Sequence, residues 1–192
     1  MKLQVAEASL PTKYYGRFRI FIFKTPDGKE HAALVLGDVK GKKDVLTRLH
    51  SECLTGDVFH SLRCDCGEQL EKALKQIRKH GEGVLLYLRQ EGRGIGLFNK
   101  IRAYKLQEQG MDTVEANVHL GFGGDMRNYE EAAAILKYLG VRSVVLITNN
   151  PQKIQGLRKE GIPAKRLPSK VKSHKLNRGY LATKKKKMGH LI

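Results

Sequence analysis

Long apolar runs are missing from this 192-residue sequence, although 41% of its residues are hydrophobic. A membrane-spanning helix needs about 20 consecutive apolar residues, so the sequence predicts a soluble protein with no membrane partner. Residues 1–16 contain no apolar stretch as long as that of a signal peptide, which favours a cytoplasmic location. A chain of this length can still bury a core in one or two small domains.

Acidic residues are also scarce, since 19 Asp and Glu oppose 36 Lys and Arg and leave a net charge of +17. The segment 163–192 contains ten Lys and Arg and no acid, so more than half of the excess lies there. Such a charge suits nucleic acid or polyphosphate ligands. A run such as Lys184 to Lys187 is nevertheless most often a solvated surface.

Cysteine is also scarce, because the sequence contains only Cys53, Cys64 and Cys66. Three cysteines cannot all pair within one chain, and the last two are too close in sequence for an unstrained disulfide. Thiolates bind zinc strongly, so the cluster indicates a metal site. A fourth ligand from His50 would make that site structural, whereas water in the fourth position would allow catalysis. The spacing leaves both open, together with three unrelated buried thiols.

Apolar periodicity predicts an α/β protein with mixed sheets, flanking helices and a β-rich N-terminal part. Cys64 and Cys66 precede the first expected helix, where the helix N-terminus stabilises thiolates. Asn150 is an expected N-cap, with Pro151 at the first helical position. The expected strands are 13–24, 31–39, 44–50, 83–90 and 143–148, and the expected helices are 68–81, 97–110, 129–140 and 151–162.

The glycine-rich loop 91–96, EGRGIG, lies between an expected strand and an expected helix. That arrangement presents backbone N–H groups to a phosphate. A plain strand-to-helix turn explains the pattern equally well, because the loop matches neither standard nucleotide fingerprint.

Eight separate motifs, taken in order, resemble GTP cyclohydrolase II from about residue 2 to the end of the chain. The departures are Asn128, where Asp is common, and a Lys-rich segment at 163–175. The motifs are HSECLTGD (50–57), LRCDCGEQL (62–70), RQEGRGIGL (89–97), NKIRAY (99–104), DTVEAN (112–117), GDMRNY (124–129), TNNPQK (148–153) and KMGHL (187–191).

The resemblance is to the stand-alone form, because the chain has no room for the synthase domain to which this enzyme is often fused. We therefore expect one catalytic domain at 1–162 and a basic segment at 163–192 that is part of the domain or flexible. The resemblance also implies a homodimer with GTP as its ligand and no nucleic-acid partner. The basic segment would assist nucleotide capture or close over the site.

The implied reaction opens the purine ring of GTP at the start of riboflavin synthesis. It releases pyrophosphate, and carbon 8 as formate, leaving 2,5-diamino-6-ribosylamino-4(3H)-pyrimidinone 5′-phosphate. Cys53, Cys64 and Cys66 would hold one zinc ion per chain, whose bound water attacks carbon 8, with His50 outside the ligand set. Mg²⁺ would accompany the triphosphate, with Glu91 as a candidate ligand.

The resemblance assigns three catalytic residues and a set of GTP contacts. Tyr104 would assist at the ring, while Asp125 and Arg127 would be general base and nucleophile at the α-phosphate. An arginine stays protonated in proteins, so a charge clamp is the competing role for Arg127. The implied GTP-contacting residues are Arg48, Leu49, His50, Ser51, Glu52, Gln69, Glu91, Gly92, Arg93, Thr113, Thr148 and Lys153.

Two alternatives from other classes remain. A zinc nucleobase deaminase fits His50 to Glu52 as His-x-Glu, but the Pro-Cys-x-x-Cys half of that signature is missing. A basic RNA-binding protein with structural zinc fits the charge, but the sequence has no stacking-aromatic signature of an RNA module.

Overall fold

The computed structural model describes residues 3–169 and 173–191. The chain divides into two compact units, each assembled from three separate segments. The first comprises 1–50, 70–89 and 128–169, and the second comprises 51–69, 90–127 and the described part of 170–192. The expectation of a single domain at 1–162 stays a prediction. Residues 170–172 and 192 of the expected basic segment lie outside the described part of the chain.

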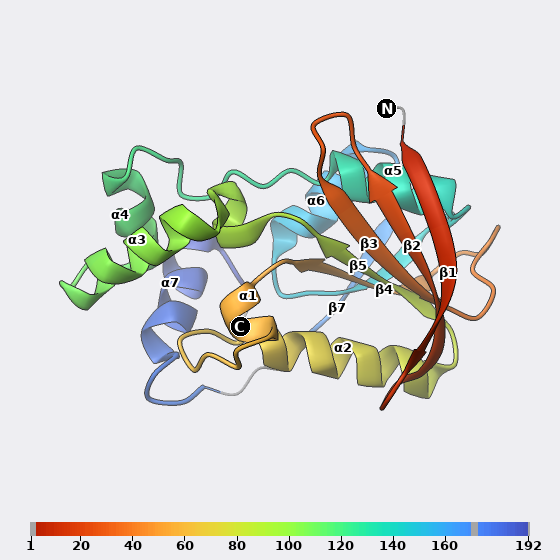
Figure 1. The fold of residues 1–192 in the computed structure, drawn as a ribbon, viewed down its shortest axis with the longest axis horizontal. Coiled ribbons are helices and arrows are strands. Elements are labelled where there is room, and N and C mark those ends of the chain that lie inside the picture. The colour runs from red at the N-terminus through yellow and green to blue at the C-terminus, as the bar shows by residue number, and fades with distance from the viewer. Residues whose placement is uncertain (1–2, 170–172, 192) are drawn as a thin grey trace. The chain divides into compact units, whose positions relative to one another are not determined.

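A seven-stranded sheet forms the centre of the first unit, in the order β1-β2-β3-β5-β4-β6-β7 (Figure 1). The pairs β1–β2, β2–β3 and β3–β5 are antiparallel, whereas β4–β6 and β6–β7 are parallel, so the sheet is mixed as predicted. The strands are β1 (Gln4–Thr12), β2 (Gly16–Lys24), β3 (Glu30–Leu36), β4 (Val45–Ser51), β5 (Gly83–Leu88), β6 (Val144–Ile147) and β7 (Ala164–Leu167).

The central strands of the sheet are buried on both faces, and β5 shows this because successive side chains along a strand point to opposite faces. Leu85 of β5 joins one apolar cluster, while its neighbours Val84 and Leu86 join the other. Helix α2 (Cys66–His80) packs Ala73 and Ile77 into the first cluster. Helices α5 (Glu130–Tyr138) and α6 (Pro151–Lys159) pack into the second. The first unit is thus a sheet between two helical layers, which confirms the α/β class.

Local sequence explains several element boundaries. Asn150 is the N-cap of α6, since its side chain accepts a hydrogen bond from the Gln152 N–H at 2.9 Å, and Pro151 follows at the first position, both as predicted. The expected strand 31–39 ends earlier, at Leu36, because Gly37 adopts φ +71°, which strands do not accommodate. Strand β1 was not predicted, because most of its residues are exposed and it lacks the alternation of a half-buried strand.

The second unit is helical. Its elements are α1 (Leu54–Asp57), the 3₁₀ turn η1 (Glu91–Gly94), α3 (Gly96–Glu108), α4 (Thr113–His119) and α7 (Arg178–Met188). A capping box starts α4: the Asp112 side chain accepts from backbone N–H groups, and the Glu115 side chain accepts from the Asp112 N–H at 2.9 Å. Lys187 of α7 forms ion pairs with both acids. None of the described helices is both long and apolar enough to cross a membrane.

Replacing Ile77 by Ala should lower the free energy of unfolding by about 2–5 kcal/mol, because the side chain is fully buried between α2 and the sheet. Urea unfolding followed by circular dichroism measures the change. Gln76→Ala is the matched control, since Gln76 is the exposed neighbour on the same helix and should stay within about 0.5 kcal/mol. Equal losses in the two variants would contradict this packing.

Candidate functional site

The three cysteines lie in one segment of the second unit, residues 51–69, at the ends of two short stretches that fold back on each other. Cys53 caps α1, Cys64 precedes α2, and Cys66 is the first residue of α2. Their sulfur atoms all lie within 4.8 Å of one another, and those of Cys53 and Cys64 are 3.7 Å apart. Three thiols at such separations can share one metal ion. Among the residues that the structure describes, this is the only group with such geometry, and it contains no histidine.

Gly56 forms part of the cradle around the sulfur atoms. A Cβ atom at this position would come within 2.8 Å of the Cys64 sulfur and 3.2 Å of the Cys53 sulfur. At Gly67 a Cβ atom would collide with the Gly56 carbonyl oxygen at 2.3 Å. Gly56 therefore lets the backbone approach the thiols closely, and Gly67 lets α2 approach the backbone at Gly56. The donor set fits a thiophilic metal such as zinc.

Lys100 supplies positive charge to the cluster. Its Nζ lies 3.2 Å from the Cys53 sulfur and donates to Glu91 Oε1 at 2.8 Å. Hydrogen bonds from the thiols of Cys64 and Cys66, together with this ammonium group, hold the pKa of Cys53 far below its usual range. Burial lowers the pKa of Lys100, but the Cys53 thiolate and Glu91 outweigh burial and raise it. Without a metal, the site therefore favours a thiolate at Cys53 next to a protonated lysine.

Glu91 is a buried carboxylate with several donors. Oε2 accepts from the Leu54 N–H at 2.7 Å, while Oε1 accepts from the Gly92 N–H at 2.8 Å and from Lys100. Glu91 thus forms a buried ion pair with Lys100. The Mg²⁺ role that the resemblance implies for Glu91 stays a prediction.

The EGRGIG loop has an unusual backbone. Arg93 adopts φ +64°, a left-handed conformation that is uncommon for a residue with a side chain. Its guanidinium donates to Thr113 Oγ1 at 2.9 Å and to the Gly124 carbonyl at 3.3 Å, and its own carbonyl accepts from the Met126 N–H at 3.1 Å. Arg93 thereby holds the segment that carries Asp125 and Arg127.

Asp125 and Arg127 form a two-pronged ion pair, in which Arg127 Nε donates to Oδ1 at 2.8 Å and Nη2 donates to Oδ2. Both side chains are largely buried. Burial raises the pKa of Asp125, but hydrogen bonds and charge from Arg127 outweigh it, so the pKa lies below its ordinary value. The remaining Nη1 lies 3.5 Å from Ser51 Oγ. The pair therefore favours a fixed, protonated guanidinium and a weakly basic carboxylate.

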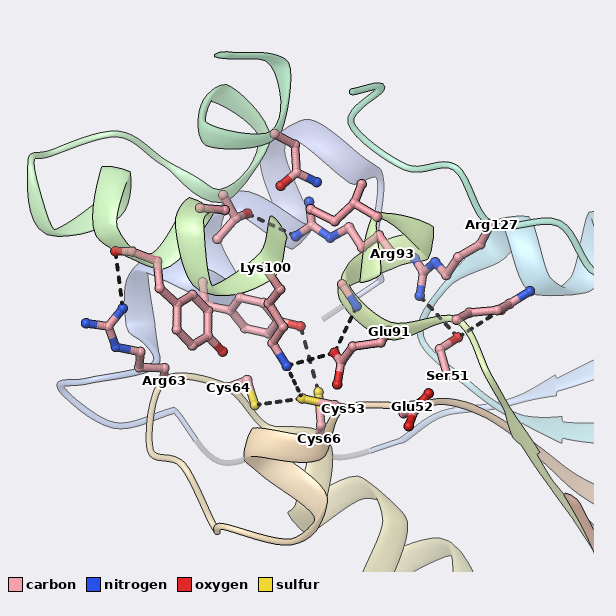
Figure 2. Close-up of a pocket in the computed structure, with 18 of the residues that line it drawn as sticks. Ser51, Glu52, Cys53, Arg63, Cys64, Cys66, Glu91, Arg93, Lys100 and Arg127 are labelled. Atoms are coloured by element: carbon pink, nitrogen blue, oxygen red, sulfur yellow. Dashed lines mark hydrogen bonds and ion pairs between the residues drawn. The ribbon is translucent and has the colours of Figure 1, made fainter. Parts of the chain in front are cut away.

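A pocket in the second unit joins these groups, with about 680 Å³ of space that is partly open to solvent. Figure 2 shows the cysteines with Lys100 above them and Arg127 near Ser51. Predicted site residues that line the pocket are Ser51, Glu52, Cys53, Cys64, Cys66, Glu91, Gly92, Arg93, Tyr104, Thr113 and Arg127. Gln69 is not part of this lining, and its amide donates to the Asp65 carboxylate.

The other predicted GTP contacts belong to the first unit. Arg48 donates to the Ile147 carbonyl at 2.9 Å, and Lys153 donates to the Leu49 carbonyl at 2.6 Å. Thr148 Oγ1 accepts from the Asn150 N–H at 3.0 Å, and the His50 ring stacks on Tyr87 with centroids 5.5 Å apart. These polar side chains are buried, so their contacts fix the ends of β4 and β6.

Sequence reasoning missed eight residues that line the pocket, and three of them contact the proposed site residues: Arg63, Lys100 and Tyr180. The Arg63 guanidinium carbon lies 4.7 Å from the centroid of the Tyr104 ring. Lys100 is part of the NKIRAY motif, which marked its segment but not its contact with Cys53. Tyr180 lies in the basic segment, for which the sequence predicted only a role of its lysines. Only tertiary contacts identify these residues.

Three thiols that could hold one metal ion and the guanidinium of Arg127 line one pocket of this α/β protein, an arrangement that fits the class of hydrolases. The sequence profile of GTP cyclohydrolase II matches residues 3–167. The GTP cyclohydrolase-2 of Histophilus somni (strain 2336) is 58% identical over 98% of this chain and 88% of its own length. That of Archaeoglobus fulgidus is 60% identical over 98% of this chain and 50% of its own length. The chain belongs to the GTP cyclohydrolase II family.

Replacing Arg127 by Met should raise the pKa of Asp125, because burial remains while the opposing guanidinium is gone. In the wild type, the ion pair stabilises the fold above the pKa of an unfolded aspartate, and this contribution is lost as the pH falls through the lowered folded pKa. Carboxyl-carbon NMR titration measures the shift. Arg102→Met is the control, since Arg102 is exposed and contacts Asn99. An unchanged Asp125 pKa in the Arg127 variant would contradict the pairing.

Proposed function

We propose that this protein hydrolyses GTP to formate, pyrophosphate and 2,5-diamino-6-ribosylamino-4(3H)-pyrimidinone 5′-phosphate, the first step of riboflavin synthesis. The family membership and relatives named GTP cyclohydrolase-2 support the proposal. The observation that carries it is the convergence of three cysteine sulfurs within 4.8 Å of one another in a pocket that Arg127 also lines. A metal held by these cysteines would then lie in the same pocket as the arginine proposed to act on the phosphates.

Cys53, Cys64 and Cys66 would hold one zinc ion. Zinc bound there would supply a Lewis acid and an acidified water for attack on carbon 8. Tyr104 is the proposed assistant at the ring: burial raises its pKa, so its hydroxyl stays protonated and can donate to the purine. That hydroxyl lies 3.3 Å from Thr55 Oγ1, which orients it. Lys100 would balance part of the negative charge of the three thiolates.

On the phosphate side we favour Arg127 as a charge clamp, with Asp125 holding its guanidinium. The lowered pKa of Asp125 and the two-pronged ion pair both oppose proton removal from the arginine, which a nucleophile would need. A fixed cation instead suits stabilisation of negative charge that develops at the α-phosphate. We propose the GTP-contacting residues that the family resemblance implies, with Mg²⁺ on the triphosphate, a homodimer and a cytoplasmic location.

Incubation with GTP tests the activity, with pyrophosphate and formate measured on the same samples. Cys53→Ser should abolish formate release, because a neutral hydroxyl is a much poorer zinc ligand than a thiolate. Pyrophosphate release should persist in that variant. Arg127→Ala should abolish or strongly slow both products, because a clamped α-phosphate fixes the purine for ring opening.

Other product patterns would decide against this account. Ammonia in place of formate would support a deaminase, and salt-dependent RNA retention without either product would support an RNA-binding protein. A folded Cys53→Ser variant that binds GTP but releases no pyrophosphate would show that the two reacting centres are not separable.

Replacing Gly56 by Ala should weaken zinc binding, because the added methyl group would press on the sulfur atoms of Cys53 and Cys64. Competition against a chromophoric chelator measures the affinity, and we expect a loss of about tenfold or more, as for other changes around a metal site. Gly179→Ala is the matched control, since a Cβ atom there meets nothing within 4 Å. Unchanged affinity in the Gly56 variant would place the zinc elsewhere.

A further inference from the structure

The four consecutive lysines of α7 are not equivalent. Lys184 is buried, with 8% of its surface exposed, whereas Lys185 and Lys186 are exposed. Lys187 is exposed and binds the acids at the start of α4. Burying a lysine is costly unless it is paired, so the burial of one member of the run calls for a specific partner.

That partner is Asp65, the residue between Cys64 and Cys66. Lys184 Nζ donates to Asp65 Oδ1 at 2.7 Å, and the side chain of Asp65 is fully buried. The amide of Gln69 donates to the other carboxylate oxygen. The buried carboxylate is therefore paired with a lysine on one side and hydrogen-bonded to an amide on the other.

Tyr180, one helical turn before Lys184, makes a second connection to the cysteine cluster. Its hydroxyl lies 3.9 Å from the Cys66 sulfur, and it lines the pocket. Lys184 Nζ lies 4.3 Å from the centroid of the Tyr180 ring, which orders both side chains. Two side chains on one face of α7 thus contact the Cys64–Cys66 segment, one at its carboxylate and one at a sulfur.

We propose that α7 clamps the metal-binding segment, with Lys184 as the positioning residue. Its ammonium neutralises a carboxylate that is flanked by two thiolate ligands. Without it, the buried Asp65 charge would repel the thiolates and turn toward water, carrying the segment out of the geometry that one metal ion needs. The inference rests on the proposed metal site and assigns a part of it to a segment that lies beyond the residues 3–167 matched by the family profile.

The test compares four full-length variants: Lys184→Met, Lys184→Arg, Lys185→Met and Lys186→Met. Zinc affinity is measured by chelator competition, and cobalt spectra report the geometry of the bound metal. Lys184→Met should bind zinc about 10–100-fold more weakly and change the cobalt bands. Lys185→Met and Lys186→Met remove the same charge from the same helix and should bind within about twofold of the wild type. Lys184→Arg should recover most of the affinity.

Equal zinc affinity in Lys184→Met and the wild type would overturn the clamp, as would equal losses in all three Met variants. If Lys184→Met does not fold, Asp65→Asn/Lys184→Met removes both charges and with them the repulsion, so the clamp predicts a folded double variant that recovers most of the zinc affinity. A double variant that also fails to fold, or that folds and binds no zinc, would overturn it. If the wild type binds zinc no more tightly than the Cys53→Ser variant does, the proposed metal site itself is rejected.

Discussion

The mutual repulsion of three sulfur atoms within 4.8 Å of one another is the constraint on which the site depends. Without a metal, the pKa values of the thiols shift in opposite directions. The pKa of Cys53 is lowered, while hydrogen bonding to Cys53 raises the pKa of Cys64 to about 11. Bound zinc would remove the conflict by taking all three as thiolates, with release of protons. Gly56 and the N-terminal end of α2 hold the three sulfur atoms close together in the metal-free protein.

Two buried lysines place positive charge near the cysteine cluster, and each forms an ion pair with a different carboxylate. Lys100 contacts Cys53 and Glu91, and Lys184 contacts Asp65. Burial lowers the pKa of Lys100, but the Cys53 thiolate and the Glu91 carboxylate outweigh burial and raise it, so this lysine stays charged. The positive charge is therefore fixed and does not depend on solvent, so the same contacts order the segments that carry the thiols.

The sequence predicted most of the fold and the chemistry of the ligands, because those features are local. Asn150 and Pro151 start α6 where their types require, and three cysteines within fourteen residues indicate one metal site. The local sequence could not show that Lys184 is buried and Lys185 exposed, because a run of identical residues has no periodicity. The burial of Lys184 depends on its ion pair with Asp65, which is distant in the sequence. Likewise, Asp112 and Glu115 carry a capping-box signal that would have located α4, whereas the contact of Lys100 with Cys53 exists only in the folded chain.

X-ray absorption spectroscopy at the zinc edge of the purified protein tests the central claim most directly. The account predicts one zinc ion per chain with three sulfur neighbours at about 2.3 Å and one lighter neighbour from water, without the outer-shell scattering of an imidazole. Four protein ligands, whether through a histidine or a fourth sulfur, would close the position that catalysis needs. That result, or a protein that holds no zinc, would contradict the account.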